Sequence, residues 1–161
     1  MGSEQLQTFA GPALVIGFVV ILVLCIIADK NSGKKFQKMI ESKYKIKDKL
    51  GKIRITENDE ILMSVPSGTL PGYKLWKLSE IFYVGMNTIP TKASMNMLGF
   101  CFMDAKKKPL TGEYLTPSKK PLLQKKMTTF GAADKKELDE IYALIKKHLP
   151  NVGRIENGKE V

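Results

Sequence analysis

Lysine is the side chain whose number and spacing suggest chemistry in this chain of 161 residues, which holds 26 Lys and Arg residues against 16 Asp and Glu residues. Between Lys30 and Arg54 there are ten basic residues and two acidic ones. Closely spaced ammonium groups attract phosphate, on lipid headgroups or on nucleic acid. Six lysines are therefore candidates for contact with a lipid surface: Lys34, Lys35, Lys38, Lys43, Lys45 and Lys47.

Three further lysine groups lie in the second half of the chain, at Lys106–Lys108, Lys119–Lys120 and Lys125–Lys126. Residues 55–161 carry 16 basic and 12 acidic side chains, so most of the positive excess lies between residues 30 and 54. A domain that binds duplex nucleic acid concentrates positive charge on its folded face. The charge distribution therefore favours an anionic membrane surface as the partner and argues against nucleic acid. Solvated turns, or a role in membrane topology alone, are the alternatives for these lysines.

Candidate catalytic, cofactor-binding and metal-binding residues are scarce. The single histidine, His148, falls at the end of a predicted helix, where we expect a capping or solvent-facing role. Cys101 falls in a predicted strand and is expected to be a small buried hydrophobic side chain. One acidic cluster occupies a predicted hairpin turn: Glu57, Asp59 and Glu60. We therefore predict no catalytic residue, cofactor or metal ion, and an accessory or small enzyme domain with an unrecognised pocket is the alternative.

The elements that position these residues begin with an uncharged segment, FAGPALVIGFVVILVLCIIA, over residues 9–28. A helix of this length rises about 30 Å, which matches the hydrocarbon thickness of a bilayer. No Lys or Arg precedes the segment and no small-x-small cleavage site follows Ala28, so a signal peptide is disfavoured. We predict a transmembrane helix over residues 9–28.

The flanking charges predict the orientation of this helix. Basic residues are retained on the cytoplasmic side of a membrane, and the ten basic residues of positions 30–54 all follow the apolar segment. Residues 1–8 are therefore expected to lie outside the cell membrane, with the C-terminal domain in the cytoplasm. A surface-exposed membrane protein of the opposite topology is the alternative.

Residues 29–50 are predicted to form a basic juxtamembrane helix or linker after a break at Asn31–Gly33. Five apolar residues recur near helical spacing, with lysines on the remaining face: Phe36, Met39, Ile40, Tyr44 and Leu50. Such a helix favours electrostatic attachment to the anionic inner leaflet.

From residue 51 the apolar pattern changes to a period of two, which predicts short strands. The expected strands cover residues 52–56, 60–65, 73–78, 81–86, 98–103 and 110–115, with a seventh within 122–130. An amphipathic helix over residues 134–149 follows, with Asp134 and Glu137 in a capping box at its start. The polar residues 151–161 are expected to form a flexible tail.

This order of six or seven short strands and one amphipathic helix resembles the bacterial pleckstrin-homology-like (PH-like) domains. The local resemblance lies at Leu78–Ile81, at Phe100–Asp104 and over the helix of residues 134–149. For residues 51–150 it implies an antiparallel β barrel or sandwich closed by one C-terminal α helix. A plain α+β sheet with one packed helix is the fallback.

The resemblance also implies a binding role, since PH-like domains bind phosphoinositides or peptides where they bind a known ligand. The expected protein is thus a single transmembrane helix plus an α+β soluble domain. We expect it to act as a non-catalytic binding or scaffold module at the inner leaflet. The expected partners are the anionic lipid bilayer and a membrane-associated protein.

Overall fold

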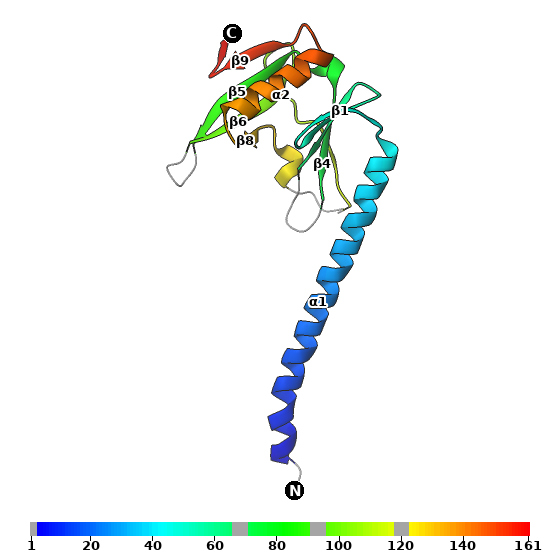
Figure 1. Ribbon diagram of the computed structural model, residues 1–161. Coiled ribbons are helices and arrows are strands. Elements are labelled where there is room, and N and C mark those ends of the chain that lie inside the picture. The colour runs from blue at the N-terminus through cyan, green and yellow to red at the C-terminus, as the bar shows by residue number, and fades with distance from the viewer. Residues whose placement is uncertain (1–2, 66–70, 91–95, 118–122) are drawn as a thin grey trace.

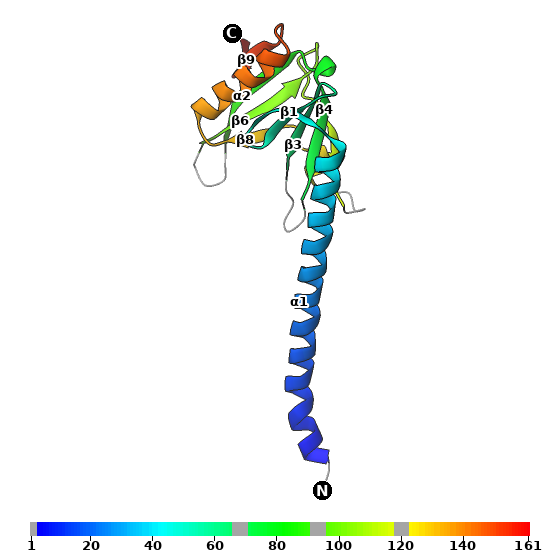
Figure 2. The same ribbon diagram turned by 45° about the vertical axis from the view of Figure 1, so that its right-hand side comes forward.

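The computed structural model describes residues 3–65, 71–90, 96–117 and 123–161. One long helix, α1 (Ser3–Lys43), leads into an α+β domain of two β-sheets and a second helix, α2 (Lys135–His148). Figure 1 shows α1 projecting from the domain as a single rod. The turned view in Figure 2 shows that most of the domain lies to one side of the helix axis.

The predicted break at Asn31–Gly33 is wrong, because α1 continues through it to Lys43. A single glycine costs a helix only about 1 kcal/mol relative to alanine, and packing of the following turns against the domain offsets this cost. The strand β1 (Ile46–Leu50) begins soon after α1 ends. Residues 46–50 therefore belong to the domain, and the juxtamembrane helix predicted for residues 29–50 is too long at its C-terminal end.

The first sheet is antiparallel and is built mostly from strands that are neighbours in sequence. In spatial order its strands are β1, β2 (Ile53–Thr56), β3 (Glu60–Ser64), β4 (Tyr73–Lys77) and β7 (Glu113–Leu115). The pairing of β2 with β3 confirms the hairpin that the sequence predicts around Asn58–Asp59. β7 was expected from residues 110–115 and is confirmed in a shorter form, paired with β4.

The second sheet contains one parallel pair. In spatial order its strands are β10 (Lys159–Glu160), β9 (Gly153–Glu156), β5 (Tyr83–Pro90), β6 (Asn96–Met103) and β8 (Phe130–Ala132). The apolar run over residues 81–86 predicts a strand that is buried on both faces, and β5 is the middle strand of this sheet. It pairs antiparallel with β6 and parallel with β9. Two short 3-10 helices, η1 (Leu78–Glu80) and η2 (Leu123–Lys126), connect the strands.

The flexible tail predicted for residues 151–161 is wrong, because these residues form β9 and β10. Val152 and Ile155 are buried, and the backbone of β9 pairs with one edge of β5. A turn at Asn157–Gly158, with φ of 47° and 81°, reverses the chain into β10. The segment is mostly polar, which suggests a tail, but its two buried apolar side chains, Val152 and Ile155, pack in the folded domain.

The α+β class, with one N-terminal apolar helix and a helix near the C-terminus, is confirmed. A closed barrel is not confirmed, because no described strand of one sheet pairs with a strand of the other. Apolar side chains of both sheets instead fill a shared core, which includes Ile53 and Ile55 of β2 and Phe100 and Phe102 of β6. Trp76 packs edge-on against Phe102, with ring centroids 5.0 Å apart.

α2 begins as the sequence predicts. The Asp134 Oδ1 atom accepts a hydrogen bond from the backbone N–H of Glu137 at 2.7 Å, and the Glu137 carboxylate accepts one from the N–H of Ala133 at 2.6 Å. The buried face of α2 packs into the shared core through four side chains: Leu138, Ile141, Leu144 and Ile145. The helix thereby covers one side of the space between the sheets (Figure 1).

The last turn of α2 is tied to β1 through Asp48. The Asp48 carboxylate accepts a hydrogen bond from the Lys147 ammonium at 2.7 Å and lies 3.1 Å from Nε2 of His148. These two contacts lower the pKa of Asp48 to about 2. Of the two roles expected for His148, capping or solvent-facing, the solvent-facing one is wrong, because its side chain is only 9% exposed.

Candidate membrane-facing basic surface

α1 carries a long exposed apolar surface. The large apolar side chains from Val15 to Ile27 are all exposed, Phe18 by 64%. Within the described residues, one helix is long and apolar enough to cross a membrane. An exposed apolar surface of this length is rare on a monomeric soluble domain and marks a region that another apolar phase or partner covers.

The C-terminal part of α1 packs on the outer face of the first sheet. Ile40 is buried against Leu62 of β3 and against Tyr73 and Leu75 of β4. The ring of Phe36 lies 6.2 Å from the ring of Tyr73. β3 and β4 are therefore buried on both faces, by the shared core on one side and by α1 on the other.

Gly33 allows α1 to approach the domain closely at the point where the two first meet. A Cβ atom at position 33 would lie 2.9 Å from Cδ of Pro71, which is too short for a normal contact. The glycine that suggests a flexible break in the sequence is thus a packing position. No flexible joint separates the exposed apolar part of α1 from the segment that packs on the first sheet.

We expect Ile40→Ala to weaken the docking of α1 and to lower the free energy of unfolding of the domain by about 2 kcal/mol, because a buried side chain is truncated. Denaturant unfolding of the full chain in detergent, followed by Trp76 fluorescence, measures this loss. Met39→Ala is the matched control, since Met39 is the preceding residue and is 51% exposed. An equal effect of both substitutions would show that the docked face contributes nothing specific.

The structure divides the six predicted lipid-contacting lysines into two groups. Lys34, Lys35 and Lys38 are exposed on α1 before its docked turns, and we call them the proximal lysines. At a rise of ~1.5 Å per residue they lie about 9 to 15 Å along the helix from Ala28. This distance places their long side chains within about one Debye length of headgroups at the end of the apolar segment.

Lys43, Lys45 and Lys47 lie farther from the apolar segment, at and beyond the end of α1. The Lys43 ammonium lies 5.1 Å from the centroid of the Tyr44 ring, and the Lys47 ammonium lies 3.8 Å from the Asp59 carboxylate. By helix rise, Lys43 is already about 22 Å past Ala28, beyond effective electrostatic reach at physiological salt. Of the six candidates, the proximal lysines therefore lie nearest to the apolar segment, and the other three lie farther from it.

Lys74 is a buried residue that sequence reasoning missed. Its side chain is 0% exposed, and its ammonium donates hydrogen bonds to the backbone carbonyls of Thr111, Lys125 and Met127. It also lies 5.9 Å from the Trp76 ring centroid. Burial lowers its pKa to about 8. Lys74 shares the core-facing side of β4 with Trp76, and this i, i+2 relation is the sequence signal that could have found it.

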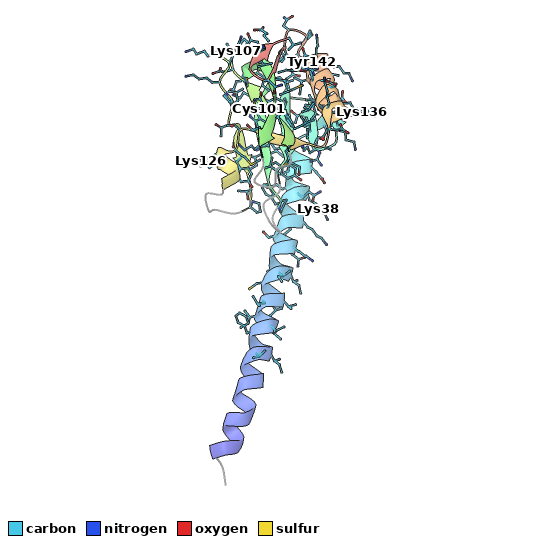
Figure 3. All side chains as sticks on the ribbon, turned by 90° about the vertical axis from the view of Figure 1, so that its left-hand side faces the viewer. Lys38, Cys101, Lys107, Lys126, Lys136 and Tyr142 are labelled. Carbon is cyan, nitrogen blue, oxygen red and sulfur yellow. The ribbon has the colours of Figure 1, made fainter. Side chains whose placement is uncertain are left out.

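Lys74 holds the C-terminal end of η2, where Lys125 and Lys126 are both exposed. Figure 3 shows Lys126 and Lys38 at the end of the domain that faces the apolar part of α1. Lys107 lies at the opposite end in the same view. The ammonium of Lys107 pairs with the Glu160 carboxylate at 2.8 Å, so the charge of Lys107 is balanced within the protein. Lys119–Lys120 lie outside the described residues.

The remaining candidates for chemistry are dispersed. Cys101 is buried, as the sequence predicts, and desolvation raises the pKa of its thiol. Asp59 lies in the β2–β3 turn and is exposed, as expected for the acidic cluster. Within the described part of the chain, no three His, Cys, Asp or Glu side chains come together as a metal site.

A cavity of about 180 Å³ lies between β5, the start of α2 and the β9–β10 turn. Lys135 and Arg154 contribute positive charge to it, and Glu156 contributes negative charge. The Arg154 guanidinium is already engaged, because it contacts Glu156 and donates to the Asp139 carboxylate at 2.6 Å. The charges around this cavity are therefore largely balanced within the protein, in contrast to those of the proximal lysines.

No protein-family model, curated protein or solved structure matches this chain. Two features of the structure itself define the candidate site: the course of α1 and the position of the lysines along it. An exposed apolar helix continues without interruption into a docked segment. The proximal lysines flank this junction, and none of them forms an ion pair with a carboxylate among the described residues. Such an arrangement can hold a folded domain against an anionic surface, through apolar insertion and electrostatic attraction acting together.

Proposed function

We propose that this chain is a single-pass membrane protein of the cell membrane whose α+β domain acts as a non-catalytic binding or scaffold module beside the inner leaflet. The observation that carries the proposal is the continuity of α1, whose exposed apolar part leads directly into turns packed on the first sheet. A bilayer would cover the exposed side chains from Val15 to Ile27. The domain would then be held at a constant distance from the lipid.

The orientation of the proposed protein follows from charge. Basic residues lie on the domain side of the apolar segment, at Lys30 and at the proximal lysines, which favours a cytoplasmic domain. The cytoplasmic leaflet carries the anionic lipids that such lysines attract. A membrane-associated protein is the second proposed partner, and it would bind the face of the domain away from α1.

A PH-like architecture is part of this proposal. Two sheets that share one core, covered on one side by an amphipathic helix, are common to that architecture and to this domain. The strands β9 and β10 after α2, and the parallel pairing of β9 with β5, depart from the pattern expected by resemblance. The binding role does not depend on this assignment, because it rests on the docked anchor.

Topology is the experiment that tests the proposal. We expect a protease-sensitive tag placed after Val161 to be protected in intact cells and cleaved once the cells are permeabilised. The full chain should also stay with the membrane during alkaline carbonate extraction. A tag on a known external loop of another membrane protein in the same cells serves as the control.

Cleavage of the tag in intact cells would assign the opposite topology and overturn the cytoplasmic role. Release of the chain by carbonate would show that the apolar part of α1 is not embedded. Either outcome would contradict the proposal.

A further inference from the structure

We infer that Lys125 and Lys126, at the end of η2, form a second contact of the domain with anionic lipid headgroups, separate from the proximal lysines of α1. This inference rests on the proposed membrane anchoring and adds a surface to it. Two contacts on different sides of the domain would define which face meets the bilayer and which face points away. The free face would then include α2.

The position of η2 relative to α1 is the first support. Figures 1 and 3 show η2 and α1 on different sides of the domain, with Lys126 and Lys38 both toward the apolar part of α1. Because α1 is continuous and docked, the direction of its axis also defines the direction of the bilayer relative to the domain. With α1 crossing the membrane, the end of the domain that carries Lys126 overhangs the lipid surface.

The contact of Lys74 with η2 is the second support. The buried Lys74 ammonium binds the backbone carbonyls of Lys125 and Met127, and it binds that of Thr111 on the adjacent connection. These bonds turn the backbone of the segment toward the core, while the side chains of Lys125 and Lys126 are exposed. The two ammonium groups are thus presented on an anchored segment, which lowers the entropy lost on contact with lipid.

Charge is the third support. The sequence from Tyr114 to Ala133 holds four lysines and no Asp or Glu. Among the described residues no carboxylate pairs with Lys125 or Lys126, whereas Lys107 pairs with Glu160 and Lys47 pairs with Asp59. Unpaired ammonium groups keep their full attraction for lipid phosphate and carboxylate groups, and this attraction is screened by salt.

The test uses the full chain in lipid nanodiscs, with Cys25→Ser to remove the exposed thiol. A fluorophore attached at Met127→Cys reports proximity to nitroxide-labelled lipid headgroups by quenching. A fluorophore at Lys106→Cys, in the turn that contains Lys107, is the distant control. Nanodiscs of phosphatidylcholine, with and without phosphatidylserine, supply the neutral and the anionic surface.

We expect stronger quenching at position 127 than at position 106 in both kinds of nanodisc, because docked α1 holds that end of the domain toward the lipid. The quenching at position 127 should be stronger in anionic than in neutral nanodiscs. Lys125→Gln and Lys126→Gln should each lower the ratio of quenched to unquenched label about fivefold. Salt at ~0.5 M should act in the same direction, because the Debye length falls to a few Å. The matched pair Lys106→Gln and Lys108→Gln, measured with the label at position 127, should leave the ratio unchanged.

Equal quenching at both positions in anionic nanodiscs, or equal quenching at position 127 in neutral and anionic nanodiscs, would overturn the inference while the chain remains embedded. Loss of the chain from the nanodisc would instead refute the proposed anchoring. Unchanged Trp76 fluorescence in each variant would show that the domain is still folded, so that a change in quenching reports position alone.

Discussion

Lys74→Met is expected to lower the free energy of unfolding of the domain by about 2 to 5 kcal/mol, because it leaves buried carbonyl groups without a donor. Methionine has nearly the length of lysine, so the variant removes the ammonium with little change in packing volume. The carbonyls of Thr111 and Met127 would then lie in the protein without the hydrogen bonds that Lys74 now supplies. Thermal or denaturant unfolding of the full chain in detergent measures the loss.

Lys77→Met is the matched control for this substitution. Lys77 lies on the same strand, β4, and is exposed, so its replacement should change stability by less than about 0.5 kcal/mol. If Lys74→Met proved as stable as the unmodified chain, the cost of desolvating the ammonium would equal the gain from its hydrogen bonds. The hydrogen bonds of Lys74 would then contribute no net stability to the domain, and the prediction would be wrong.

The pH dependence of stability provides a second measurement on Lys74. Its pKa is about 8 in the folded protein, below the ordinary lysine pKa of 10.5, so between pH 8 and pH 10.5 the unfolded chain binds more protons. Stability therefore rises with pH across that window, by at most ~1.4 kcal/mol per pH unit. The neutral amine keeps two N–H donors for the carbonyls. This rise should be present in the unmodified chain and missing in Lys74→Met.

Combined truncation of Ile141 and Ile145 to alanine is expected to unfold the domain or to cost about 4 to 10 kcal/mol, since each truncation costs about 2 to 5 kcal/mol. Ile141 is 1% exposed and Ile145 is 0% exposed, and both face the core that the two sheets share. A loss of this size approaches the whole stability of a domain of this length. Either single variant should still fold, with a lower melting temperature by Trp76 fluorescence.

Lys146→Ala is the control for the α2 variants, because Lys146 is exposed on the same helix and alanine favours the helical state. It should leave the melting temperature nearly unchanged. Unchanged melting of the double isoleucine variant would show that α2 does not seal the core.

The elements that sequence alone predicts best have a long apolar run, a clear helical spacing of apolar residues, or a helix cap formed by neighbouring residues. The apolar part of α1 and the amphipathic α2 are examples, and the capping interaction of Asp134 with Glu137 is present as expected. β5 is central, as its uninterrupted apolar run indicates. These features depend on residues close together in sequence, so a single sequence contains them.

Long-range packing decided the features that sequence reasoning got wrong. Alternation in β4 places Tyr73 and Leu75 on one face, but that face meets α1, and Lys74 lies with Trp76 on the core side. The alternation of side chains correctly predicts a strand, but it does not indicate which face of the strand packs in the shared core. The sequence around Gly33 likewise predicts a break, because the close contact of Gly33 with Pro71 depends on the fold.

The candidate site shows the same limit. Six lysines on one basic segment look equivalent in sequence, yet the end of α1 at Lys43 separates those near the apolar segment from those held in or beside β1. Lys125 and Lys126 look like a solvated turn. Only their place at the end of the domain nearest the apolar segment, seen in Figure 3 for Lys126, gives them a possible partner.

The docking of α1 on the first sheet also has a mechanical consequence. Spanning helices adapt to the thickness of a bilayer by tilting, commonly by about 20°. A domain on a flexible tether would not respond to such a tilt. Here Ile40 and Gly33 join the helix to β3, β4 and the segment at Pro71, so helix and domain turn as one body. If α1 spans a bilayer as proposed, a change in membrane thickness would be converted into a rotation of the domain, with α1 as the lever.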